Sequence, residues 1–139
     1  MALVVTNDAE VQMLIRLVGD ITSLPSRNQV MKLYTDPLGT IDDDFTAASF
    51  TEATAAGYAA ATMVPAGWSA ATVSGTSSAT YSPDVTFSFT AAESVAGYYV
   101  VDTTSPTAVL LWAESFSGGP FVLPSSGGQI QITPTLSLA

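Results

Sequence analysis

The chain contains no cysteine and no histidine, and it has only three basic residues against twelve acidic ones. Without these two residue types it forms no disulfide, no thiolate nucleophile, no zinc-finger ligand set and no imidazole base. A serine hydrolase would need Lys32, the only lysine, as its base, and Gln29 stands where a Ser-x-x-Lys motif needs serine. The sequence therefore excludes much of the common chemistry of enzymes.

The few charges are unevenly placed along the chain. Residues 1–32 hold all three bases, Arg16, Arg27 and Lys32, and three acids balance them. Residues 33–139 hold nine acids and no base, so this part carries the whole net charge of −9. Such a surface repels nucleic acid and anionic membranes, so we expect neither as a partner. An acidic surface suits solubility, and attraction of a basic partner is the alternative.

Long hydrophobic runs are also missing. No apolar run approaches the ~20 residues that a membrane-spanning helix needs. Residues 1–5 lack the basic region and the long apolar region of a signal peptide, so we expect none. The length of 139 residues and the 47% of hydrophobic residues predict one domain with its own core.

A short α-helix is predicted over residues 8–18. Asn7 can cap it, and Glu10 follows at the spacing of a capping box. Apolar residues then recur with helical spacing and form one stripe of interface candidates, namely Val11, Leu14, Ile15 and Val18. We expect the stripe to cover an open end or face of a sheet, and binding to a partner is the alternative. Residues 1–24 are assigned to an N-terminal arm and helix.

From residue 25 onwards the pattern is typical of β structure. Val85, Phe87 and Phe89 alternate with polar residues, which is the period of a half-buried strand. Strands are predicted at residues 29–35, 58–63, 69–82, 85–90, 97–101, 109–112, 121–123 and 129–133, and the segment 75–78 is expected to be a mobile loop. About eight or nine strands after one helix predict a mainly β fold. We expect an antiparallel β-sandwich or jelly-roll-like domain over residues 25–139.

The strands at residues 97–101 and 109–112 are predicted to form a hairpin. Within it Tyr98 and Tyr99 are adjacent, so their side chains must point to opposite faces of the sheet. We expect one of them in the core and the other at the surface or in an interface between subunits. Trp112 on the second strand is a further interface candidate.

Several acidic residues are candidates for chemistry. Glycoside hydrolysis needs only two carboxylates, so Glu52, Glu93 and Glu114 qualify by residue type. Nothing in the sequence pairs them. Glu93 is expected in an exposed turn, and Glu114 is expected at the rim of a sheet, beside aromatic residues that could raise its pKa. The run of three acids at residues 42–44 could offer oxygen ligands to Ca²⁺, but it lacks the EF-hand spacing, so a solvated turn is favoured. No catalytic, cofactor or metal residue is assigned.

The aromatic residues could form a platform for carbohydrate. The set is large enough for one, but packing in the core or between subunits is favoured, because neighbouring members must point to opposite faces. The members are Tyr58, Trp68, Tyr81, Tyr98, Tyr99 and Trp112.

Three groups of segments together resemble a known class of proteins. They are residues 50–52 with Gly57-Tyr58 and Trp68; residues 86–90 with 97–102; and residues 110–114 with Phe116, Gly119-Pro120 and residues 134–136. In this order they resemble small virion structural proteins of tailed bacteriophages, some of which are similar to capsid decoration (cement) proteins. The resemblance covers most of the chain and is carried by packing and turn motifs.

This resemblance implies a structural protein of the virion, with an all-β fold, no enzyme activity and no cofactor. The expected partners are the major capsid protein or other virion proteins, and further copies of the chain in a homo-oligomer, for which a trimer is the expectation. The capsid surface is the expected location, with docking through the N-terminal part that holds the bases. A tail- or fibre-associated protein is the nearby variant, and a carbohydrate-binding β-sandwich for host adsorption is the alternative from another class.

Overall fold

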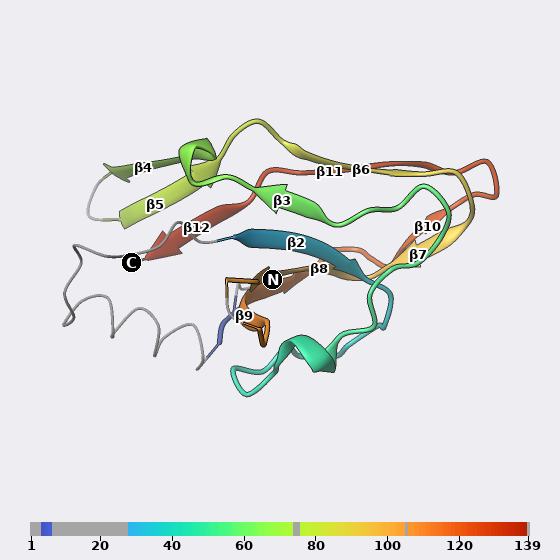
Figure 1. The fold of residues 1–139 in the computed structure, drawn as a ribbon, viewed down its shortest axis with the longest axis horizontal. Coiled ribbons are helices and arrows are strands. Elements are labelled where there is room, and N and C mark those ends of the chain that lie inside the picture. The colour runs from blue at the N-terminus through green and yellow to red at the C-terminus, as the bar shows by residue number, and fades with distance from the viewer. Residues whose placement is uncertain (1–3, 7–27, 74–75, 105, 139) are drawn as a thin grey trace.

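The computed structural model of the chain describes residues 4–6, 28–73, 76–104 and 106–138, and this part is mainly β (Figure 1). All pairings between its strands are antiparallel. The strands are β1 (Val4–Val5), β2 (Gln29–Tyr34), β3 (Ala61–Met63), β4 (Trp68–Val73), β5 (Thr76–Tyr81), β6 (Val85–Phe89), β7 (Glu93–Val95), β8 (Gly97–Asp102), β9 (Val109–Ser115), β10 (Phe121–Leu123), β11 (Gly128–Ile132) and β12 (Thr135–Leu138). The connections include two short 3-10 helices, η2 (Ala47–Ser49) and η3 (Pro65–Gly67).

Five strands form the central sheet, in the order β1-β9-β8-β2-β3. β2 lies beside β8 along its whole length, with Met31 opposite Val100 and Tyr34 opposite Gly97. All six residues of β8 are buried. Its nearly continuous run of aromatic and β-branched residues is the composition that burial on both faces requires. The centre of the core therefore lies at β8.

A β-bulge shapes the hairpin of β8 and β9. Val100 lies opposite Trp112 and Val101 lies opposite Leu110, so Leu111 has no partner on β8. An extra residue of this kind disturbs the strict alternation of side chains along a strand. As a result Leu111 and Trp112, although adjacent, both pack in the apolar cluster that contains Val100.

One face of the central sheet packs against the remaining strands. These form three smaller units in the order β12-β5-β4, β11-β6 and β10-β7. In Figure 1 β6 and β11 run above β2 and β3, and β7 and β10 lie at the right-hand end. Phe87 and Phe89 of β6 share one cluster with Met31, Leu33 and Val100 of the central sheet. The alternation of residues 85–89 is therefore explained by a strand with one face on the core and one face in water.

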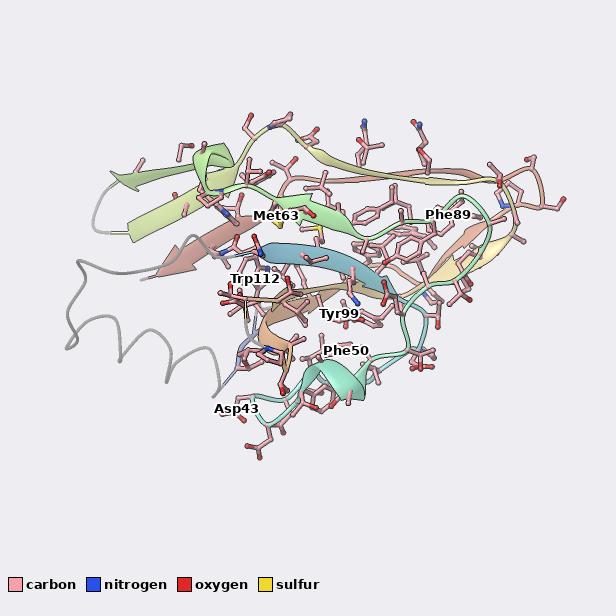
Figure 2. The ribbon with its side chains drawn as sticks, in the orientation of Figure 1. Asp43, Phe50, Met63, Phe89, Tyr99 and Trp112 are labelled. Carbon is pink, nitrogen blue, oxygen red and sulfur yellow. The ribbon has the colours of Figure 1, made fainter. Side chains whose placement is uncertain are left out.

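The other face of the central sheet is covered by residues 35–54, which contain no strand. Phe50 stacks on Tyr99 with ring centroids 4.7 Å apart and an angle of 10° between the planes. Ile41 and Phe50 share a second apolar cluster with Tyr34 and Tyr99. Figure 2 shows Phe50 and Tyr99 on one side of β2 and Met63 on the other. Burial of such large side chains contributes about 1.5–3 kcal/mol each, so this cover is a substantial part of the core.

The predicted strands are confirmed in most places. The hairpin of residues 97–112 is present as β8 and β9, and β2, β6, β10 and β11 lie where strands are predicted. The predicted strand at 58–63 is shorter, since β3 begins at Ala61. The predicted single strand at 69–82 is wrong, because β4 and β5 form a paired unit there. Thr76 to Ser78, predicted as part of a mobile loop, belong to β5, and Glu93 begins β7 instead of lying in a turn.

The predicted N-terminal helix at residues 8–18 lies outside the described residues. β1 is described, and its two residues pair with Ala113 and Trp112 of β9. Within the N-terminal arm and helix assigned to residues 1–24, Val4 and Val5 therefore form an edge strand of the central sheet.

Candidate functional site

The three interface candidates from the hairpin are all buried within the chain. Tyr98 and Tyr99 are each 3% exposed and Trp112 is 4% exposed. The two tyrosines do point to opposite faces, because Tyr98 packs in the cluster with Met31 and Tyr99 in the cluster with Phe50. The expectation that one of them reaches the surface or an interface is wrong, since both faces of the central sheet are covered. The candidates Val11, Leu14, Ile15 and Val18 lie outside the described residues.

Trp112 is also a core residue and not an interface residue. Its ring meets Trp68 edge-on, with centroids 5.8 Å apart, and Trp68 in turn meets Tyr81 at 5.4 Å. Tyr81 is 6% exposed, and Tyr58 and Trp68 are half-buried. A carbohydrate platform needs open ring faces. These aromatic residues instead pack on one another, as the favoured interpretation of the sequence expects.

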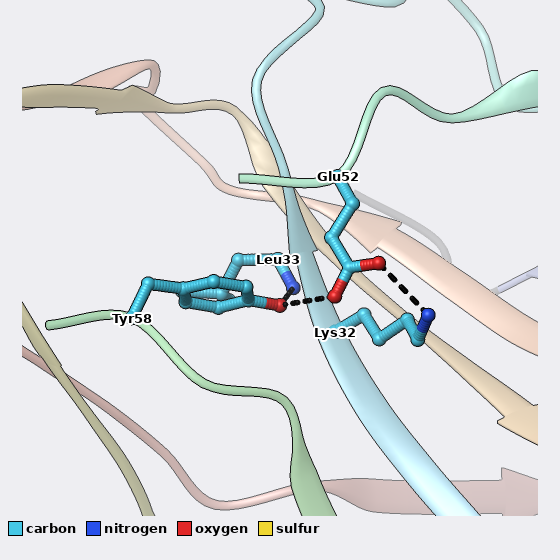
Figure 3. A network of polar contacts seen from close by, with 4 residues as sticks. All are labelled: Lys32, Leu33, Glu52 and Tyr58. Carbon is cyan, nitrogen blue, oxygen red and sulfur yellow. Dashed lines mark hydrogen bonds and ion pairs between the residues drawn. The ribbon is translucent and has the colours of Figure 1, made fainter. Parts of the chain in front are cut away.

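A polar network joins β2 to the segment that follows η2 (Figure 3). Lys32 Nζ forms an ion pair with Glu52 Oε2 at 2.8 Å. Tyr58 Oη donates to Glu52 Oε1 at 3.1 Å and accepts a hydrogen bond from the backbone N–H of Leu33 at 3.1 Å. Burial raises the pKa of Tyr58, and the charge of Glu52 raises it further. Tyr58 is therefore held neutral as a donor, which fastens residues 52–58 to β2.

The ion pair in this network also gives the positive charge of Lys32 a negative partner. The two side chains are 28% and 32% exposed, and a pair this open to water contributes at most about 1 kcal/mol. Lys32 is the only base in the described residues, and its charge is matched by Glu52.

Glu93 and Glu114 serve other parts of the fold. Glu93 Oε2 accepts the backbone N–H groups of Thr54 and Ala55 at 3.2 and 3.0 Å, and this ties β7 to the loop before Tyr58. Glu114 Oε2 accepts the hydroxyl of Tyr98 at 2.8 Å. Burial raises the pKa of Tyr98, and the hydrogen bond to Glu114 adds to this.

The three candidate carboxylates of a glycosidase, Glu52, Glu93 and Glu114, therefore have separate partners, and no two of them share one among the described residues. The geometry explains each of them as an acceptor that holds the fold. The group whose pKa is raised here is Tyr98, through its burial and its hydrogen bond to Glu114. The expected rim position of Glu114 fits its place near the end of β9.

The acidic run at residues 42–44 forms an exposed turn. The backbone N–H of Asp44 donates to Asp42 Oδ1 at 3.1 Å, and Phe45 N–H donates to the carbonyl of Asp42 at 3.2 Å. The three carboxylates have oxygens within 4.8 Å of one another, and all three residues are exposed. Hydrogen bonding between the side chains raises the pKa of Asp43 and lowers that of Asp42. The predicted solvated acidic turn is confirmed (Asp43 is labelled in Figure 2).

A shallow pocket lies where residues 37–38 approach the turn after β9. Its volume is about 120 Å³, and its lining includes Leu38, Ala96, Phe116 and Pro120. Ser115 also faces it, and the Ser115 hydroxyl is 2.7 Å from the hydroxyl of Tyr34. This space is smaller than the ~300 Å³ at which ligand sites usually begin.

The outward apolar side chains gather at β10. Val122 is 76% exposed and Phe121 is 46% exposed, and Val64 at 54% is the other large apolar residue that is strongly exposed in the described part. The sequence interpretation missed this, because Phe121–Leu123 has the composition of a core strand. The available signal was proline on both sides, at residues 120 and 124, which is typical of an edge strand.

Comparisons of the chain with family models, with curated proteins and with solved structures find no match. Among the described residues, no helix has the length and hydrophobicity that crossing a membrane requires.

Proposed function

We propose that the chain is a structural protein of a tailed-phage virion, and specifically a capsid decoration protein that stabilises the head by contacts between subunits. The fold that we propose for it is an antiparallel β-sandwich of the jelly-roll kind. The packing of Phe87 and Phe89 of β6 on Met31 and Val100 of the central sheet supports two layers. The order of the sequence motifs and their resemblance to phage virion proteins support the class.

The observation that carries the proposal is the use of the ionisable side chains in the described part. Lys32, Glu52, Glu93 and Glu114 all bind other parts of the fold, and the acidic turn at residues 42–44 faces water. A chain built in this way presents an acidic, inert outer surface over a packed core. Those are the properties that a coat on a particle needs, since it must persist outside a cell and avoid binding nucleic acid.

The direct test is to measure the chain in purified particles. Virions that encode the chain would be purified on a gradient, and its copy number relative to the major capsid protein would be measured by mass spectrometry with labelled peptides. We expect a fixed ratio set by capsid symmetry, and density on the outer surface of the head in a reconstruction. Absence from washed particles would overturn the proposal.

Two other outcomes would replace the proposal with the alternatives. Presence of the chain on isolated tails and its absence from heads would indicate a tail- or fibre-associated protein. Clear binding of the isolated chain to a glycan array would favour a carbohydrate-binding role in host adsorption. Burial of Tyr81, Tyr98, Tyr99 and Trp112 predicts no such binding.

The route of docking can be tested by charge alone. We expect the basic residues Arg16 and Arg27 to contact an acidic capsid surface. Because β1 pairs with β9, deletion of the N-terminus would disturb the central sheet, so the double substitution Arg16→Ser and Arg27→Ser is the sharper variant. Capsid occupancy should fall, and undiminished occupancy by the folded variant would contradict this docking route.

A further inference from the structure

Residues 37–49 make no backbone–backbone hydrogen bond to the central sheet within the part of the chain that the structure describes. Their backbone–backbone hydrogen bonds there are three local turns, closed by the N–H groups of Leu38, Phe45 and Ser49. The strands beside them are instead joined by continuous ladders of pairs. The segment therefore covers the sheet without being part of it.

The two ends of this segment are fixed in the sheet. Thr35 N–H donates to the carbonyl of Thr51 at 3.0 Å, and Ala53 N–H donates to that of Leu33 at 2.9 Å. Thr51 N–H also donates to Asp36 Oδ2 at 3.2 Å. Figure 1 shows the segment, with η2, leaving the end of β2 and lying below the central sheet. A loop whose ends are joined in this way is an Ω-loop, which packs through its own side chains.

Apolar side chains hold the loop against the second face of the sheet. Ile41 is 7% exposed and shares the apolar cluster of Tyr99. Leu38 and Phe45 are partly buried against the same cluster. The exposed acids at residues 42–44 lie on the outer side of the loop. The loop is therefore amphipathic, with one side on the core and one side in water.

The packing is incomplete at the first end of the loop. The pocket of about 120 Å³ lies between Pro37 and Leu38 of the loop and Ala96, Ser115 and Phe116. Space that side chains leave unfilled gives up the contacts that a packed core makes. This end of the loop is therefore loosely held.

We propose that residues 37–49 form a hinged lid, which opens away from the second face of the central sheet while the sheet stays folded. The hinges lie before Pro37 and after Ser49. Phe50 stays outside the lid, stacked on Tyr99 beside the fixed end. Opening breaks no backbone hydrogen bond of the sheet, so it belongs to the local openings that need less free energy than unfolding.

The lid controls access to two places at once. Its opening uncovers the part of the apolar face on which Ile41 packs, and it widens the pocket next to Ser115. It is a property of the free chain and does not depend on the proposed function.

The first experiment uses the absence of cysteine from the chain. Ile41→Cys places a single thiol on the inner side of the lid, and Ile132→Cys on β11 is the matched control, because the two isoleucines are 7% and 8% exposed. The rate of labelling by a thiol reagent, where it is proportional to reagent concentration, reports how often each thiol is open to water. We expect Ile41→Cys to label at least ~tenfold faster than Ile132→Cys. Its rate should also depend much less on urea, because opening of the lid exposes little surface.

Two results of this experiment would overturn the proposal. One is equal labelling of the two variants. The other is a urea dependence of Ile41→Cys as steep as that of unfolding, since the thiol would then be reached only in the unfolded chain.

A substitution on the opposite face separates opening of the lid from unfolding of the chain. Phe87 of β6 is 1% exposed and packs in the other apolar cluster. Phe87→Leu lowers the free energy of unfolding, but the contacts of residue 87 are the same with the lid open or closed. It should therefore speed the labelling of Ile132→Cys about tenfold and leave that of Ile41→Cys unchanged. Circular dichroism checks that each variant folds, and equal acceleration in both would overturn the proposal.

Hydrogen exchange of the unaltered chain locates the hinges. The N–H groups of Thr35 and Ala53 bond across the fixed ends, whereas those of Phe45 and Ser49 bond within the lid. We expect the amides of Phe45 and Ser49 to exchange at least ~100-fold faster than those of Thr35 and Ala53. Exchange of all four at one rate would place the movement in the sheet and overturn the proposal.

Discussion

The central strand β8 and the outer strand β6 use apolar residues in different ways. All six residues of β8 are buried, whereas buried and exposed residues alternate along β6. The sequence of β8 is accordingly apolar from Gly97 to Val101 and ends in the buried Asp102, and that of β6 alternates valine or phenylalanine with serine or threonine. The difference shows that β8 must be packed on both of its faces, whereas β6 is packed on one. Residues 35–54 supply the packing on the second face of β8.

The largest expected effect is the response of the doubly covered sheet to alkali. Burial raises the pKa of Tyr34, Tyr58 and Tyr98, and burial together with the charge of Glu52 raises the pKa of Tyr99 to about 12. In the unfolded chain a tyrosine loses its proton near pH 10. The unfolded chain therefore binds fewer protons than the folded one above pH 10, so the free energy of unfolding falls as pH rises from 10 towards 12 and beyond.

We expect the chain to unfold cooperatively in this range. Absorbance of tyrosinate at 295 nm and near-ultraviolet circular dichroism should change together. Tyrosines that titrate near pH 10 while the dichroism stays unchanged would show that the central sheet is more open to water than the structure indicates.

The next effect in size tests the second cover directly. Phe50→Ala removes the ring that stacks on Tyr99 and whose centroid lies 5.0 Å from that of the Tyr34 ring. Truncation of a buried phenylalanine costs about 3–5 kcal/mol of unfolding free energy. Phe121→Ala on β10 is the matched control and should cost about 1 kcal/mol or less, because Phe121 is 46% exposed. Urea unfolding of both variants measures the difference. An equal loss of unfolding free energy in the two variants would contradict the stabilising role of residues 35–54 on this face of the sheet.

The smallest effect concerns a glycine in β8. A Cβ on Gly97 would meet the carbonyl oxygen of Glu114 and the hydroxyl of Tyr34. Gly97→Ala should therefore cost about 1–3 kcal/mol through overpacking. Gly39→Ala is the control, because a Cβ there has no atom within 4 Å. Thermal unfolding should separate the two, and unchanged stability of Gly97→Ala would mean that the Glu114 backbone and the Tyr34 ring both shift without cost.

The strands could be predicted where local pattern and burial agree. Residues 85–89 alternate strictly and residues 97–101 are continuously apolar, and both predictions are confirmed. The boundary between β4 and β5 was missed, because residues 69–82 are uniformly rich in Ser, Thr and Ala and carry little contrast between faces. The surface position expected for one of Tyr98 and Tyr99 was wrong. Alternation shows that the two side chains lie on opposite faces of the sheet, but it does not show that another segment packs on each face.

The candidate site was less predictable than the fold because its contacts join distant segments. The partners of Glu52 are Lys32 and Tyr58, and the partners of Glu93 are backbone groups some 38 residues away. No local spacing predicts these pairs. The exposure of Phe121 and Val122 was also hidden, since a short apolar strand has the same sequence whether it lies at an edge or in the core.

The bulge at Leu111 has a consequence for how strand partners find each other. In a sheet with one wet face, a shift of one residue exposes apolar side chains and is rejected. Both faces of β8 and β9 are apolar, so polarity gives little protection against such a shift. Shape must reject it instead. The bulge at Leu111 and the close packing of Tyr34 on Gly97 both require the observed register of the strands. These two features therefore disfavour a shifted register of this sheet.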